Sequence, residues 1–302
     1  MKVEDKKINR RSRKSDFIHE FTKTPSGIVC PHFYVLAHAN GCPYACDYCY
    51  LQLTFRYQKE PVIFTNRQDL IRDVNRFLEK EKPSVLSAGE LSDALAFDHI
   101  TGLSKDLIPL FAEQDKHKLL FLTKSANVEN LLGINQRRNI IVSFSLNAPF
   151  ISAMHEHGAP NPLDRVDAAR KCQEAGYEVR LRIDPVIPIP GWKDHYKILL
   201  NYIKLNLNCE GMRFTIGSIR YFKSLPDFAR SRGRNVEVFK VATSCEGADR
   251  RMRVTPQLRL EIYSWFCEQL PNNSTIALCK ETIEIWKKLG WNPIGIKCNC
   301  AP

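Results

Sequence analysis

The feature that most constrains the fold is a regular alternation of strand-like and helix-like segments between residue 33 and about residue 220. Short apolar segments, most of them followed by a segment with helical spacing of its apolar residues, occur six times. The strand-like segments span residues 33–39, 84–89, 118–125, 139–147, 177–187 and 211–219. Apolar strands that alternate with helices are typical of a parallel sheet with helices outside. We therefore expect an α/β fold, a partial (β/α)6 TIM-like barrel; a doubly wound sheet would give the same pattern.

The flanks of this alternation suggest three segments. Residues 1–28 form a basic N-terminal extension, which we expect to be flexible or loosely helical. Residues 29–222 would form the partial barrel. Residues 223–302 contain a basic connector, a helix over 256–270 and several cysteines. We expect this last segment to be a C-terminal helical and cysteine-rich appendage with a second metal site.

Composition places the chain in a reducing compartment. No apolar run approaches the roughly 18 residues that suggest a membrane span, and the N-terminus has no apolar core typical of a secretory signal. The 11 cysteines are an odd number, which favours thiols used for metal binding or chemistry over disulfides. We expect a cytoplasmic protein without membrane contact.

The net charge of +11 is concentrated in two segments. Residues 1–25 carry eight Lys and Arg against four Asp and Glu, and residues 213–253 carry ten against four. Basic segments bind polyanions because phosphate neutralisation releases counterions. These segments therefore indicate a nucleic-acid partner; the alternative is a basic surface that aids solubility.

Three cysteines follow the first predicted strand with the spacing Cys-x3-Cys-x2-Cys: Cys42, Cys46 and Cys49. They lie at the carboxyl end of that strand, where β/α barrels place their active sites. Three thiolates can bind a four-iron cluster and leave one iron open to another ligand. Structural zinc would need a fourth ligand, and His32 and His38 are near enough in sequence to keep that alternative open.

A second group of cysteines gathers toward the C-terminus: Cys245, Cys279, Cys298 and Cys300. Together they could form a four-thiolate site for either an auxiliary iron–sulfur cluster or zinc, and unligated thiols are the third alternative. Cys172 and Cys267 lie on apolar helix faces and are interpreted as core residues. The roles of Cys30 and Cys209 stay open.

The first cysteine group, with Tyr48 before its last member, resembles the signature loop of radical S-adenosylmethionine (SAM) enzymes. The resemblance implies a [4Fe-4S] cluster whose open iron is chelated by SAM. It also implies reductive cleavage of SAM to a 5′-deoxyadenosyl radical, which abstracts hydrogen from a substrate. An electron donor such as flavodoxin or ferredoxin would then be a partner.

Four stretches resemble, in order and spacing, the spore photoproduct lyase family: CPYACDYCYLQLTF, SAGELSDALAFDHIT, LLFLTKSANVENLL and VSFSLNAPFI. The resemblance covers about residues 30–190 and extends more weakly to residue 265. That family is a partial β/α barrel that repairs a thymine dimer in DNA. Five residues match the cofactor site of that family: Tyr48, Ser92, Lys124, Ser145 and Asn147. Glu90 matches a Gly-Gly-Glu stretch that binds the SAM amino group in other radical enzymes.

One position departs from the lyase pattern. Glu90 stands where the lyase has the cysteine that returns a hydrogen atom, whereas Tyr50 matches the tyrosine of its hydrogen relay and is the catalytic candidate. We expect a radical SAM enzyme whose reaction is either lesion repair or a different modification. The rival hypothesis is a non-enzymatic, zinc-bound nucleic-acid-binding protein.

Overall fold

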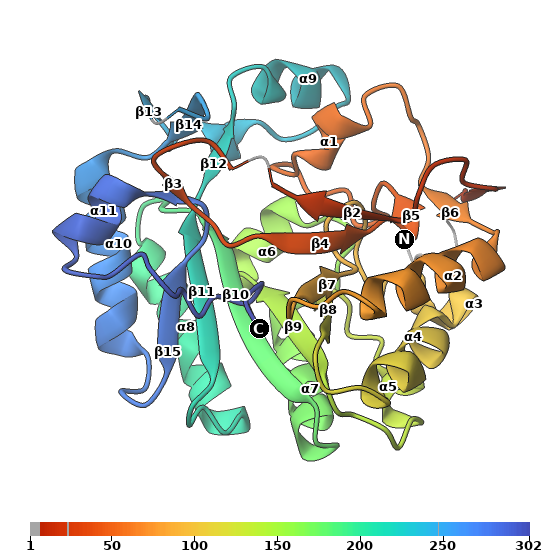
Figure 1. The fold of residues 1–302 in the computed structure, drawn as a ribbon. Helices are drawn as coiled ribbons and strands as arrows, with labels where there is room; N and C mark the ends of the chain where they lie inside the picture. Colours follow the sequence, from red (N-terminus) through yellow and green to blue (C-terminus); the bar gives the residue numbers. More distant parts are fainter. Residues whose placement is uncertain (1–6, 23, 247) are drawn as a thin grey trace.

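A central sheet of eight strands organises the molecule (Figure 1), in a computed structural model that describes residues 7–22, 24–246 and 248–302, without the side chains of residues 245 and 246. The strand order is β15-β11-β10-β9-β8-β7-β4-β2. The bounds are β2 (Ile18–Phe21), β4 (Phe33–Leu36), β7 (Val85–Ser87), β8 (Lys118–Thr123), β9 (Ile140–Leu146), β10 (Glu178–Val186), β11 (Arg213–Ser218) and β15 (Thr275–Leu278).

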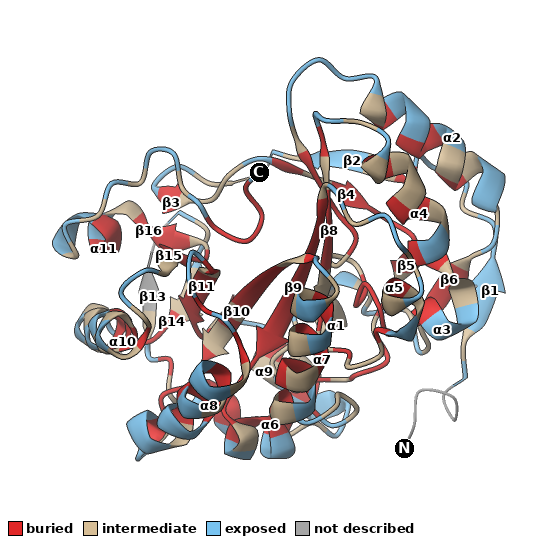
Figure 2. Cartoon of the chain, turned by 90° about the horizontal axis from the view of Figure 1, so that it is seen from below, coloured by how far each residue is buried: buried red, intermediate tan, exposed pale blue. Residues whose placement is uncertain are grey.

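All six predicted strands are present, and they lie parallel and in chain order as β4, β7, β8, β9, β10 and β11. The strands were recognisable in the sequence because they are buried and mostly apolar. In β9, for example, all seven residues are buried. Figure 2 shows the buried strands in the middle of the molecule, with helices around the outside of the sheet. An α/β fold with consecutive parallel strands is thus confirmed.

The helices that connect these strands are long where the sequence shows clear helical spacing. Helix α7, for example, begins after the N-cap Asn161, whose side chain accepts from the Leu163 amide, and is followed by Gly176 at φ +90°. The helices are α1 (Leu51–Thr54), α2 (Arg67–Leu78), α3 (Asp98–Thr101), α4 (Leu103–Ala112), α5 (Glu129–Leu132), α6 (Pro149–His155), α7 (Pro162–Glu174), α8 (Trp192–Asn206), α9 (Leu225–Ser231), α10 (Pro256–Gln269) and α11 (Ile283–Lys288). No helix in the described ranges has the length and apolar character needed to cross a bilayer.

The sheet has two strands that the sequence analysis did not predict, one at each edge. Strand β2 comes from the N-terminal extension and pairs antiparallel with β4, so the described part of this extension is not helical. Strand β15 comes from the segment 223–302 and pairs parallel with β11. That segment is therefore partly built into the main sheet; the boundaries after residues 28 and 222 stay predictions.

The sheet is open, because no pairing joins β2 to β15 in the described residues. A short ladder nevertheless connects the two edge regions, since β3 (Ile28–Val29), just after β2, pairs antiparallel with β16 (Glu281–Thr282), just after β15. The other small strands are β1 (Asn9–Arg11), β5 (Ala39–Asn40), β6 (Val62–Phe64), β12 (Arg220–Phe222), β13 (Ser244–Glu246) and β14 (Arg251–Arg253).

The last residues of the chain lie against the inner face of the sheet. The Arg180 guanidinium, on β10, donates to the carbonyl oxygens of Asn299 (3.0 Å) and Ala301 (2.5 Å). The Asn299 side-chain oxygen accepts from Thr215 Oγ1 (2.8 Å), and its amide nitrogen donates to Ser143 Oγ (2.6 Å). Asn299 is fully buried, so these bonds fix the tail in one register.

We expect replacement of Asn299 by Ala to destabilise the protein, because it leaves the buried hydroxyls of Thr215 and Ser143 short of a partner. The free energy of unfolding should fall by about 1–3 kcal/mol, measured by urea denaturation followed by circular dichroism. Asn272→Ala, at an exposed position, is the matched control and should change the unfolding free energy by less than about 0.5 kcal/mol. Equal stability of both variants would contradict the anchoring of the tail.

Candidate functional site

A cavity of about 480 Å³ opens where the parallel strands end. The Cys42–Cys49 segment follows β4 and β5, Glu90 follows β7, and Lys124 follows β8. Because parallel strands end at the same edge of a sheet, these segments converge although they are far apart in sequence. The cavity is therefore the candidate active site.

The three cysteines of this segment, here called the radical loop (residues 41–52), lie together. Cys42, Cys46 and Cys49 pack around Ala96 and Ala159 in one small cluster. Cys46 and Cys49 also border the cavity. Burial raises the pKa of all three thiols, so a positively charged metal centre would be needed to hold them as thiolates.

The donor set of the radical loop fits an iron–sulfur cluster better than a single ion. No three His, Cys, Asp or Glu side chains in the described ranges surround a common point as ligands of one ion do. The thiolates of a four-iron cluster each bind a different iron, so they lie further apart than the four ligands of zinc. The loop supplies three thiols, which meets the need of a four-iron cluster with one open iron, whereas structural zinc needs a fourth ligand.

Hydrogen bonds that the sequence analysis missed join the radical loop to residues 155–158. Asp47 has no exposed surface, and its carboxylate lies 3.0 Å from His155 Nδ1 and 2.8 Å from His157 Nε2. The Asp47 amide donates to the His155 carbonyl (2.9 Å), and the Gly158 amide donates to the Tyr44 carbonyl (3.0 Å). The segment 155–158, which begins at the last residue of α6, thus binds both the backbone and a side chain of the loop.

Glu156, in the same segment, is the centre of a buried charge network. Its carboxylate accepts from Lys124 Nζ (2.9 Å), from the Arg165 guanidinium and from the Tyr48 hydroxyl. Burial works to raise the pKa of Glu156, but the charges of Arg165 and Lys124 outweigh it and hold this pKa below its ordinary range. One carboxylate therefore orients Tyr48 and Lys124, two of the predicted cofactor residues.

The predicted cofactor residues do not all face the cavity. Tyr48, Glu90, Lys124 and Ser145 line it, and Lys124 Nζ lies 3.0 Å from Ser145 Oγ. Ser92 and Asn147 are buried outside this lining. Asn147 is bound by protein groups, since its Oδ1 accepts from the Tyr196 hydroxyl (2.6 Å), whereas Ser92 Oγ is buried without a hydrogen-bond partner in the described residues.

Glycine at position 89 lets Glu90 reach its place. A Cβ atom on Gly89 would lie 2.4 Å from the Leu122 carbonyl oxygen, which is closer than real Cβ contacts. The turn after β7 therefore packs directly on β8. Tyr50 also lines the cavity, and its hydroxyl donates to the backbone carbonyl of Glu90.

The C-terminal cysteines line the same cavity as the radical loop. Cys279, Cys298 and Cys300 are buried and line it, and Cys30, whose role the sequence left open, lines it with them. The side chain of Cys245 lies outside the described part of the structure. Cys172 is buried as predicted, and Cys267 is half-buried.

Charged residues that the sequence assigned to the second basic segment are partly structural. Arg220 pairs with Asp184 (2.8 Å) in the cavity wall, and Arg253 pairs with Asp249 (2.7 Å). Arg213 donates to the carbonyl oxygen of Pro302. A cluster of positive charge on the surface is thus smaller than the sequence count suggests.

Comparison with solved structures identifies the fold. A variant of spore photoproduct lyase with dinucleoside spore photoproduct matches with a TM-score of 0.77 and 20% identity, over 90% of this chain and 82% of that one. Another variant, with bound AdoMet and the same dinucleoside, matches with a TM-score of 0.74 and 21% identity, over 89% and 81%. The chain thus has the α/β fold of these structures.

Sequence comparison identifies the family. The model of the spore photoproduct lyase family matches residues 25–227. Spore photoproduct lyase of Clostridium acetobutylicum is 28% identical over 193 residues, which are 63% of this chain and 57% of that protein. The Bacillus subtilis lyase is 31% identical over 169 residues, or 55% and 49%. The chain belongs to the spore photoproduct lyase family, and it spans about half the length of the curated relatives it matches.

We expect Glu156→Gln to destabilise the protein in a pH-dependent way. Removing the charge leaves Arg165 and Lys124 without their buried counter-ion, so the unfolding free energy at neutral pH should fall by about 3 kcal/mol. The folded-state pKa of Glu156 lies below its ordinary value of 4.5, so its contribution is complete above that value and is lost as the pH falls below it. The difference between wild type and variant should therefore narrow below pH 4.5 in urea titrations.

The matched control is Glu174→Gln, which removes the carboxylate of an exposed i,i+4 ion pair with Arg170. This change should alter the unfolding free energy by less than about 0.5 kcal/mol. A Glu156→Gln variant as stable as this control would show that the network does not hold the loop.

Proposed function

We propose that this protein is a radical SAM enzyme with the radical loop as its cluster site. The observation that carries the proposal is the clustering of Cys42, Cys46 and Cys49, two of which, Cys46 and Cys49, line the cavity together with Lys124 and Ser145. Family membership supports it. When bound, a [4Fe-4S] cluster and SAM would supply a 5′-deoxyadenosyl radical for hydrogen abstraction, and a flavodoxin or ferredoxin would supply the electron.

The residues around the cavity have separate roles in this proposal. Tyr48 and Lys124, both held by Glu156, present an aromatic face and a cation to the cofactor, and Ser145 supplies a hydroxyl beside Lys124. The Glu90 carboxylate would pair with the amino group of SAM. Ser92, with its unpartnered buried hydroxyl, and Asn147 remain in the proposed site as residues behind this lining. A partial barrel curved around the cavity remains part of the proposal.

The reaction proposed for the site differs from simple lyase chemistry in its hydrogen donor. A carboxylate has no weak S–H bond, so Glu90 cannot return a hydrogen atom to a product radical. Tyr50 borders the cavity and remains the candidate for a hydrogen relay. We therefore leave lesion repair and a different radical modification as two outcomes for the same site.

Nucleic acid is the proposed substrate class. The related structures contain dinucleoside spore photoproduct, and the net charge of +11 favours a polyanion. Exposed cations lie on and beside α9, which contacts α1 at the end of the radical loop. Arg232, for example, donates to the Arg56 carbonyl (2.7 Å) and so holds α9 near this loop.

Replacing Cys42, Cys46 and Cys49 together with Ala should abolish formation of 5′-deoxyadenosine, because no thiolate then remains in the radical loop to bind the cluster that would cleave SAM. The measurement is anaerobic incubation with SAM and dithionite, followed by chromatography. Cys267→Ala, on α10, is the matched control and should retain the wild-type rate. Persistent deoxyadenosine formation by the triple variant would place the cofactor elsewhere.

Binding of single-stranded DNA should weaken steeply with salt. Replacing the exposed residues Lys223, Arg230 and Arg232 with Ala should reduce the slope of log K against log salt by about 2 if all three neutralise phosphates. The measurement is fluorescence anisotropy with a labelled oligonucleotide. Replacing Lys171, Lys197 and Lys204, exposed on α7 and α8, is the charge-matched control and should leave the slope unchanged. Equal slopes for both variants would contradict binding at α9.

A further inference from the structure

The cavity has a second group of thiols besides the radical loop. We propose that this group binds a second iron–sulfur cluster, through Cys30, Cys279, Cys298 and Cys300. These residues, the four-thiol group, line the same cavity as Cys46 and Cys49. The proposal goes beyond the radical SAM function, which needs only the radical loop.

The β3–β16 ladder brings Cys30 to Cys279. Val29 pairs with Glu281, so the antiparallel register places Cys30 beside Lys280, next to Cys279. Cys30 is close enough to Cys279 and Cys300 for their charges to interact. The Cys279 amide donates to the Ile216 carbonyl (2.8 Å), which ties this thiol to the end of β11. Two residues 249 positions apart in sequence thus meet at one wall.

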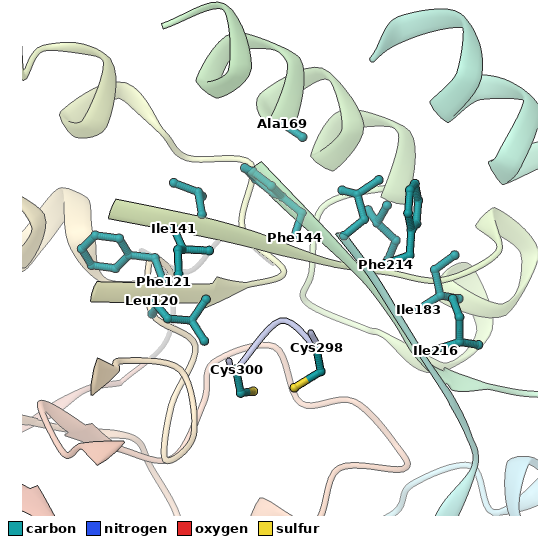
Figure 3. Packing of buried hydrophobic residues seen from close by; sticks show 14 of the residues in the cluster. Leu120, Phe121, Ile141, Phe144, Ala169, Ile183, Phe214, Ile216, Cys298 and Cys300 are labelled. Atoms are coloured by element: carbon teal, nitrogen blue, oxygen red, sulfur yellow. The ribbon is translucent and has the colours of Figure 1, made fainter. Parts of the chain in front are cut away.

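The anchored tail brings the other two thiols. Cys298 and Cys300 flank Asn299, whose side chain is bonded to Thr215 and Ser143. Figure 3 shows both sulfur atoms on the inner side of the sheet, close to each other and away from the apolar residues that pack under α7. The Cys298 and Cys300 side chains are close enough to influence each other electrostatically. Buried polar anchoring of this kind holds the two thiols in fixed positions.

The charge around the four-thiol group is suited to an anionic centre. Arg182 Nη2 lies 3.4 Å from Cys279 Sγ and 3.5 Å from Cys300 Sγ, and Arg220 Nη2 lies 3.1 Å from Cys279 Sγ. In the described residues, the Arg182 guanidinium makes hydrogen bonds only to these sulfurs, and its Nε is buried without a partner. Asp184 and Glu90 act on the Arg182 charge from further away, and thiolates that bind a cluster would place negative charge in direct contact with it.

Four cysteine thiolates are the usual ligand set of a [4Fe-4S] cluster. Four thiolates can also bind zinc, so zinc in place of iron is one outcome of the test below. Cys30 takes the place of Cys245, which the sequence assigned to this site and whose backbone lies in β13, paired with Met252 of β14.

The test measures iron and sulfide in a variant in which the three cysteines of the radical loop are replaced. The Cys42→Ala/Cys46→Ala/Cys49→Ala variant, purified without oxygen and reconstituted with iron and sulfide, should hold about four iron and four sulfide ions per chain, against about eight of each in wild type. Dithionite reduction should give an electron paramagnetic resonance signal. No SAM is involved, so a failure here is distinct from a failure of SAM cleavage by the wild type.

Further variants identify the ligands in this background. Cys298→Ser/Cys300→Ser should reduce the remaining iron to background, with an unchanged far-ultraviolet circular dichroism spectrum. Cys30→Ala should change the resonance signal and shorten the half-life of the iron under a chelator at least tenfold, whereas Cys245→Ala should do neither. About four iron in wild type, one zinc in place of the remaining iron, or an effect of Cys245→Ala without one of Cys30→Ala would overturn the proposal.

Discussion

The buried carboxylates of Asp47 and Glu156 are the constraint on which the candidate site depends. Tyr44 and Cys46 pack with Ala96 in a small apolar cluster, and polar bonds add to this packing in holding the loop. Asp47 is hydrogen-bonded to two histidines of the segment 155–158, and Glu156 of that segment accepts from Tyr48 of the loop, so hydrogen bonds join the loop to this segment. Loss of the Glu156 carboxylate would leave Arg165 and Lys124 without a counter-ion, which is costly in a buried setting. The position of Tyr48 and Lys124 follows from these bonds.

The parallel order of the sheet does the rest. Each βα connection returns the chain to the same edge, so the radical loop, Glu90, Lys124 and Ser145 come together from four separate strands. Close backbone packing at Gly89 keeps one of these turns tight. The far wall is added by the tail and by the β3–β16 ladder, which contribute sulfur and arginine side chains to the same space.

Sequence patterns revealed the parts of this arrangement whose cause is local. The six strands were predicted because they are apolar and regularly spaced, and the cysteine triplet because its spacing is compact. Glu156 was missed, since nothing in HEHG shows that its carboxylate is buried against Arg165. Strand β15 was missed because four residues, TIAL, do not stand out from a loop. Cys30 could not be assigned from sequence, because its neighbours depend on a ladder between distant segments.

That ladder has a mechanical consequence. An open sheet can flex about its strands, and the distance between its edges is then free to vary. Here two residue pairs, Ile28 with Thr282 and Val29 with Glu281, tie the region beside one edge to the region beside the other. This short ladder thereby limits how far apart the two sides of the cavity can move. A large ligand that spreads the cavity walls would have to strain these two residue pairs, which form the smallest sheet in the part of the chain that the structure describes.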